Sequence, residues 1–173
     1  MGDLSSKRIN NENKRVFIDQ GSSDSELNYV DTSGSEETFS FDYMQIRTPS
    51  EHVIDGVRFG MEIQFYFVKS DTEQAAIAIF LDDDADSDDA ENESDFIDQL
   101  NLDNLNGGTA STLDLEDFID GMPDVTFYTY EGSRTYEPCD EGVRWFVFSN
   151  PIHISASLLE NVEEHTEEGY RNF

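Results

Sequence analysis

Two runs of alternating side chains, joined by a turn-rich connection, constrain the fold of this chain more than any other feature. The runs are Phe39–Ile46 and Arg58–Val68. In both, apolar residues recur at every second position, which is the period of a β-strand with two distinct faces. A half-exposed sheet whose polar face meets water is one explanation. In the first run the apolar positions are Phe39, Phe41 and Tyr43, and the polar positions that we expect on one face of the two strands are Ser40, Asp42, Glu62 and Gln64.

The charge of the chain limits its partners. Among 173 residues, 39 are acidic and 10 are basic, for a net charge of −29. This charge repels nucleic acid and anionic membranes, so neither is an expected partner. No apolar run approaches the length that spans a membrane, and the first residues, Met1–Asn13, lack the apolar core of a signal peptide. We expect a soluble protein whose compartment is undetermined.

Three short segments of the two runs and their connection resemble those of a known family. They are FSFDY at 39–43, SEHVIDG at 50–56 and EIQFYF at 62–67. They are similar to F-H-F-H-W, S-E-H-x-x-[DN]-G and E-L-H-L-V-H of the α-type carbonic anhydrases. In this alignment the family's three zinc-binding positions are Ser40, Asp42 and Gln64, and none of them is histidine. The resemblance implies a family member without zinc ligands.

A second stretch of the chain extends the resemblance. The segments TYEGSRT at 129–135 and PCDEGVRW at 138–145 resemble the family's Y-W-T-Y-x-G-S-L-T-T-P-P-C-x-E-x-V-x-W. In active members, the threonine at the position of Thr135 hydrogen-bonds to the glutamate at the position of Glu51, and we expect that bond to persist here. The resemblance implies that the supporting residues around the metal are retained, namely Glu51, Glu62, Tyr130 and Thr135. It also implies an altered substrate pocket, formed by Tyr66, Arg134, Tyr136 and Trp145.

The resemblance implies a mainly β fold, with a twisted, mostly antiparallel central sheet and short peripheral helices. The apolar run Ala75–Leu81 has the length of a buried strand, and Ser94–Leu105 and Leu113–Ile119 are expected helical segments. The family's opening and closing segments have no counterpart in this chain. We therefore expect a disordered polar N-terminus over residues 1–9 and a single, incomplete domain over residues 10–173, which is a terminally shortened version of the family fold.

An acidic loop is expected at residues 82–98, where ten side chains are acidic and none is basic. Its alternating aspartates, Asp82, Asp84, Asp86 and Asp88, suggest comparison with a calcium-binding loop. Counted from Asp84, the sixth position of an EF-hand loop requires glycine but holds Asp89. The pattern favours a solvated surface loop, with weak cation binding as the alternative.

The single cysteine, Cys139, excludes an intrachain disulfide. Secreted members of the family pair the cysteine at this position with one in the N-terminal part that has no counterpart here. A secreted origin therefore stays open if the chain is truncated, and an intracellular homologue without the bond is the alternative.

Rapid hydration of carbon dioxide requires a bound metal that lowers the pKa of water to about 7. The three histidines, His52, His153 and His165, do not form a pair two residues apart on a strand. We therefore predict a catalytically inactive carbonic-anhydrase-like protein that binds no metal or other cofactor. Its role would be that of a structural or interaction subunit with a protein partner. The alternatives are an active, zinc-dependent carbonate dehydratase fragment and an acidic cation-binding protein that works through residues 82–98.

Overall fold

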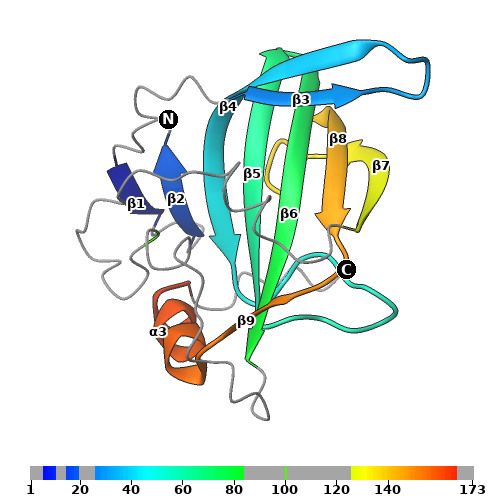
Figure 1. Cartoon of the computed structure of the whole chain (residues 1–173). Coiled ribbons are helices and arrows are strands. Elements are labelled where there is room, and N and C mark those ends of the chain that lie inside the picture. The colour runs from blue at the N-terminus through cyan, green and yellow to red at the C-terminus, as the bar shows by residue number, and fades with distance from the viewer. Residues whose placement is uncertain (1–5, 11–14, 20–25, 84–99, 101–125, 167–173) are drawn as a thin grey trace.

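A nine-stranded β-sheet forms most of the described part of the chain in the computed structural model (Figure 1). The structure describes residues 6–10, 15–19, 26–83, 100 and 126–166. The strand order is β1-β2-β4-β5-β6-β8-β7, with β3 added beside β4 and β9 beside β6. All pairings are antiparallel except those of β6 with β8 and β9. The expected mainly β, mostly antiparallel fold is confirmed. The strands are β1 Ser6–Asn10, β2 Arg15–Asp19, β3 Glu26–Val30, β4 Glu36–Arg47, β5 Met61–Ser70, β6 Glu73–Asp83, β7 Phe127–Ser133, β8 Glu141–Phe148 and β9 Ile152–Ile154.

The central strands β5 and β6 are buried on both faces. On one face, Ile63, Phe65 and Phe67 join the larger apolar core. On the other face, Tyr66 and Phe80 pack with Trp145 in a second, smaller core. Apolar side chains on both sides explain why residues 75–81 read as a continuous apolar run, as predicted for a buried strand.

A β-bulge in β4 changes which residues share a face. The pairing of β4 with β5 shifts between Phe41 and Tyr43, so Asp42 is the extra residue. Phe39 and Phe41 belong to the larger core together with Met44 and Ile46. Tyr43 belongs to the smaller core on the opposite face. The expectation that Phe39, Phe41 and Tyr43 share one face is therefore wrong, because the inserted residue reverses the alternation beyond it.

The expected polar face of β4 and β5 is only partly in water. Ser40 is exposed and Asp42 is half-buried. Glu62 and Gln64 have no solvent-exposed surface, and neither does Gln45 on the neighbouring strand. The expectation of a polar face that meets water is therefore wrong at Glu62 and Gln64. The loop at residues 134–140 supplies Thr135, which contacts the buried Gln45 and Gln64.

An α-helix that the sequence pattern did not single out, α3, covers Ala156–Thr166 and follows β9 directly. Ser155 caps it, since the Ser155 hydroxyl accepts from the backbone N–H of Leu158 at 3.3 Å. Leu158, Leu159 and Val162 pack onto the larger core. Among the described helical residues, no helix is long and apolar enough to cross a membrane.

Two of the expected segments overlap described strands. Residues 6–9 of the expected polar N-terminus lie in β1 and pair with β2, whose backbone supplies the hydrogen bonds that a polar segment needs. The acidic loop does not begin at residue 82, because Asp82 and Asp83 are still part of β6 and pair with β9. Residues 84–98 and the segment Leu113–Ile119 lie outside the described residues. The same holds for Ser94–Leu105 except Leu100, which is buried in the larger core.

Candidate functional site

A cluster of buried polar side chains lies where β4 and β5 pair, on the sheet face of the smaller core. We define this polar cluster as Gln45, Arg47, Glu62, Gln64 and Thr135. The strand register places Gln45 opposite Gln64 and Arg47 opposite Glu62. The four strand residues are at most 5% exposed. Buried polar groups at this density require partners, because each unpaired group costs on the order of 1–3 kcal/mol.

The two glutamine side chains form the centre of the cluster. The Gln45 amide nitrogen, Nε2, donates to Gln64 Oε1 at 2.5 Å. It also lies 3.2 Å from the hydroxyl of Tyr66 and 3.2 Å from Thr135 Oγ1. Tyr66 and Thr135 donate in turn to Gln64 Oε1, at 3.1 and 3.3 Å. One carboxamide oxygen is therefore the acceptor for three donors.

Arg47 brings a cation into the same cluster. Its Nη2 lies 3.0 Å from Glu51 Oε1 and donates to Thr135 Oγ1 at 3.3 Å. Burial lowers the pKa of Arg47 from its ordinary value, and the carboxylate of Glu51 opposes this shift. Among the described residues, Arg47 Nε and Gln45 Oε1 are the buried side-chain atoms without a hydrogen-bond partner.

Glu51 and Thr135 are linked through the other members of the cluster. Gln64 Nε2 donates to Glu51 Oε2 at 3.1 Å, and Gln64 Oε1 accepts from Thr135. Arg47 contacts both residues as well. The direct hydrogen bond that we expect between Glu51 and Thr135 stays a prediction.

A second hydrogen-bonded chain runs from the cluster to the surface. Glu62 Oε1 lies 2.6 Å from His52 Nδ1, and His52 Nε2 lies 2.6 Å from the Tyr130 hydroxyl. The other Glu62 oxygen accepts from the backbone N–H groups of Glu51 and His52, at 2.8 and 2.9 Å. Burial by itself raises the pKa of Glu62, but the charge and hydrogen bonds of His52 outweigh it and hold this pKa below its usual range. Burial likewise opposes the charged form of His52, and Glu62 raises the His52 pKa overall.

A sequence profile of the eukaryotic-type carbonic anhydrases matches residues 3–172. The chain belongs to this family. Dioscorin DB3L of Dioscorea polystachya is 27% identical over 148 residues, which are 83% of this chain and 54% of the relative. Carbonic anhydrase 6 of Canis lupus familiaris is 33% identical over 144 residues, or 70% of this chain and 44% of the relative. The chain thus spans about half the length of the curated relatives it matches.

Solved structures of carbonic anhydrases share the fold. The fungal α-carbonic anhydrase from Aspergillus oryzae superimposes with a TM-score of 0.78 at 23% identity, covering 98% of this chain and 69% of that one. The expected resemblance to the α-type carbonic anhydrases is therefore confirmed.

The positions predicted for the family's zinc ligands are not brought together. Gln64 is a member of the polar cluster, but Ser40 is exposed and pairs with Glu26 of β3 and Val68 of β5. Asp42 is the bulge residue and lines a separate surface pocket. As a consequence, the residue across from Gln64 is Gln45, and sequence reasoning missed both Gln45 and Arg47. The alternation Met44-Gln45-Ile46-Arg47, directly before the S-E-H segment, is the signal that could have identified them.

The residues of the predicted altered pocket lie side by side. The rings of Tyr43 and Tyr66 stack at 4.8 Å, and Trp145 meets Tyr66 edge-on at 5.5 Å. The Tyr136 hydroxyl accepts from Tyr43 at 2.8 Å and from Arg134 Nη1 at 2.6 Å. Tyr66 is 1% exposed and Trp145 is fully buried, so aromatic rings fill the space on this side of the cluster. Tyr130, which burial gives a pKa of about 12, stacks on Trp145 at 6.2 Å.

The described side chains do not form a metal-binding group. Among them, no three or more His, Cys, Asp and Glu side chains lie close enough together to hold a metal ion. Asp82, the first aspartate of the candidate cation loop, accepts a hydrogen bond from the backbone N–H of Gly60 at 3.0 Å. Asp84, Asp86 and Asp88 lie outside the described residues.

Proposed function

We propose that this chain is a catalytically inactive member of the carbonic anhydrase family that acts as a structural or interaction subunit. The observation that carries the proposal is the buried guanidinium of Arg47, held 3.0 Å from Glu51 at the centre of the family's site region. A fixed cation at this place opposes the binding of another cation, and hydration of carbon dioxide depends on a bound metal ion.

We further propose that Gln45, Arg47 and Gln64 occupy the positions of the family's three zinc-binding histidines. The family motifs place two histidines at alternate positions of one strand and the third on the next strand. Gln64 is the third position, its cross-strand neighbour is Gln45, and Arg47 lies two residues further on the same face. The first two positions are then five residues beyond those of the sequence alignment, since 45 − 40 and 47 − 42 both equal 5. The register supports this assignment, because with Asp42 as the extra residue Gln45, and not Met44, lies opposite Gln64.

These three side chains do not fit a zinc ion. Zinc in proteins is held by thiolate, imidazole or carboxylate donors. A guanidinium offers only N–H donors and stays protonated, so Arg47 has no lone pair to give. The carbonyl oxygen of Gln64 is already used by three donors of the cluster. Hydrogen bonds among the protein's own groups therefore take the place of a metal centre.

Metal analysis combined with a hydratase assay tests the inactive assignment. The purified chain, incubated with zinc and then dialysed, is expected to retain no stoichiometric zinc and to hydrate carbon dioxide no faster than buffer. About one zinc per chain together with hydratase activity would instead support the alternative of a zinc-dependent dehydratase fragment.

The interaction part of the proposal rests on strand β7. Among the described strands it lies at the end of the sheet and pairs only with β8. Its residues 127–131 are all exposed, and Phe127, Tyr128 and Tyr130 are 50%, 56% and 42% exposed. An exposed sheet edge that carries aromatic side chains is a surface that proteins usually cover. A protein partner that pairs with this edge would protect it.

A further inference from the structure

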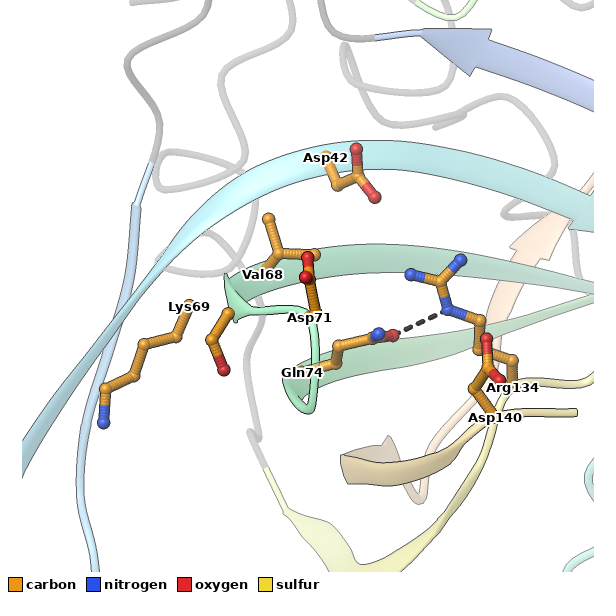
Figure 2. A pocket seen from close by; sticks show the side chains of 8 residues that line it. Asp42, Val68, Lys69, Asp71, Gln74, Arg134 and Asp140 are labelled. Atoms are coloured by element: carbon orange, nitrogen blue, oxygen red, sulfur yellow. Dashed lines mark hydrogen bonds between the residues drawn. The ribbon is translucent and has the colours of Figure 1, made fainter.

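A surface pocket of about 350 Å³ lies beside the polar cluster and contains none of its members (Figure 2). Its walls come from the bulge of β4, the end of β5, the turn into β6, and the loop at 134–140. Gly142 lets the turn approach β8, since its φ is +91° and a Cβ there would lie 2.6 Å from the Thr72 carbonyl oxygen. A volume at the lower end of the range for ligand pockets suits a small molecule. The lining residues are Asp42, Val68, Lys69, Ser70, Asp71, Gln74, Arg134 and Asp140.

Hydrogen-bond donors are fixed at the base of this pocket. Arg134 Nε donates to the Gln74 carboxamide oxygen at 2.7 Å, and Arg134 Nη1 donates to the Tyr136 hydroxyl at 2.6 Å. The guanidinium also lies over the Tyr136 ring, 5.6 Å from its centroid. These contacts hold the Arg134 guanidinium in place. Within the described residues, its Nη2 makes no hydrogen bond, and neither does Nε2 of Gln74, a side chain that is 5% exposed.

Three carboxylates surround these donors. Asp42, Asp71 and Asp140 come from three separate segments of the chain, and Figure 2 shows all three around the space that the Arg134 guanidinium enters. In the described part of the chain, the carboxylates of Asp71 and Asp140 make no hydrogen bond or ion pair. Lys69 does not neutralise them, because its ammonium group binds Glu37 at 2.6 Å and Glu73 at 3.4 Å and points away from the pocket.

The geometry points to a binding site for a small zwitterion of the α-amino acid class. The ligand's carboxylate would accept one hydrogen bond from Arg134 Nη2 and one from Gln74 Nε2, because a charged N–H donor binds a carboxylate more strongly than a neutral one does. Its ammonium group would lie among Asp42, Asp71 and Asp140. A simple anion would meet three carboxylates, and a simple cation would meet the fixed guanidinium. Only a ligand with both charges satisfies both halves of the pocket.

Ligand titrations followed by NMR of the ¹⁵N-labelled chain test this assignment. L-alanine is expected to shift the amides of residues 70–74 and 134–140 saturably, with a Kd of about 1 mM for so open a pocket. Acetate and methylammonium, the two halves of the zwitterion, should each bind at least about tenfold more weakly. Equal binding of acetate would overturn the proposal in favour of an anion site. Shifts no larger than those of an equal concentration of NaCl would overturn it altogether.

Variants on the pocket rim give a second, independent test. Asp71→Asn and Asp140→Asn change exposed side chains and should preserve the fold, and together they should weaken L-alanine binding by about tenfold or more. Asp55→Asn is a control for the loss of a surface carboxylate, because it removes one negative charge from the connection at the other end of β5 and should leave binding unchanged. Unchanged L-alanine binding in the double variant would contradict the assignment.

Discussion

Gln45 lies directly opposite Gln64 in the β4–β5 pair, and its amide nitrogen donates to Gln64 Oε1 at 2.5 Å. In the family motif, residues at alternate positions of one strand act together with a residue of the next strand as metal ligands. Here the facing pair is joined by its own hydrogen bond, and Arg47, the next residue on that face, is paired with Glu51. The facing positions of β4 and β5 thus support an internal polar network.

Introducing histidines at each of the two candidate sets of zinc positions should discriminate between the two alignments. We expect the triple variant Gln45→His/Arg47→His/Gln64→His to bind about one zinc per chain, because three imidazoles then face one another across two strands. The matched control is Ser40→His/Asp42→His/Gln64→His, whose first two positions lie away from Gln64 and should give no stoichiometric site. Zinc bound by the control and not by the first variant would show that the original alignment is the correct one.

The Arg47–Glu51 ion pair should contribute to stability. Arg47→Met leaves Glu51 without its cation, and we expect a loss of about 2–3 kcal/mol in the free energy of unfolding, measured with urea. The estimate is below that of a fully buried pair because the Glu51 side chain is 27% exposed. The double variant Arg47→Met/Glu51→Gln should recover part of the loss. Losses that simply add would mean that the two residues are not coupled.

The hydroxyl of Thr135 should matter more than its methyl group. It accepts from Gln45 and Arg47 and donates to Gln64, so Thr135→Val should destabilise the fold by about 1–3 kcal/mol. Thr135→Ser keeps the hydroxyl and serves as the control, with a smaller loss expected. An unchanged melting temperature in the valine variant would count against a retained role for this residue.

The Glu62–His52 pair should make stability depend on pH in two directions. Because the folded-state pKa of His52 is raised, its contribution is full below the ordinary value of 6.5 and is lost as the pH rises through the folded-state pKa. Because the pKa of Glu62 is lowered, its contribution is present above 4.5 and is lost as the pH falls. The gap in unfolding free energy between the natural chain and His52→Gln should therefore be widest between these values. A gap that widens steadily above pH 6.5 would contradict this linkage.

The aromatic edge of β7 should mediate association. Sedimentation of the native material is expected to reveal a bound partner or an assembly, and Tyr128→Lys should weaken it by placing a charge on the exposed edge. Val57→Lys is the control, because Val57 is 54% exposed but lies in the turn before β5 and not on the β7 edge. A compact monomer that binds no apolar dye would remove the reason for proposing a partner.

The sequence was informative where a pattern is local and unbroken. The strands around residues 39–46, 58–68 and 75–81 were predicted from alternation or from a continuous apolar run, and they correspond to β4, β5 and β6. The bulge at Asp42 could not be predicted, because an extra residue is defined only by the strand that pairs with it. With that extra residue, Gln45 instead of Met44 lies opposite Gln64. Helix α3 was missed although Ser155 and the Leu158, Leu159, Val162 spacing were visible in the sequence.

The parallel pairing of β6 with β8 and β9 has a consequence for the order of folding. The neighbours β4, β5 and β6 follow one another along the chain, so their pairing closes only short loops and can form early. Residues 74–78 of β6 pair with residues 143–147 of β8, which lie far along the chain, and such distant pairings form slowly. Before β8 pairs with it, β6 exposes an unpaired and almost wholly apolar edge. Refolding yield should therefore fall as chain concentration rises, because intermediates that expose such an edge aggregate.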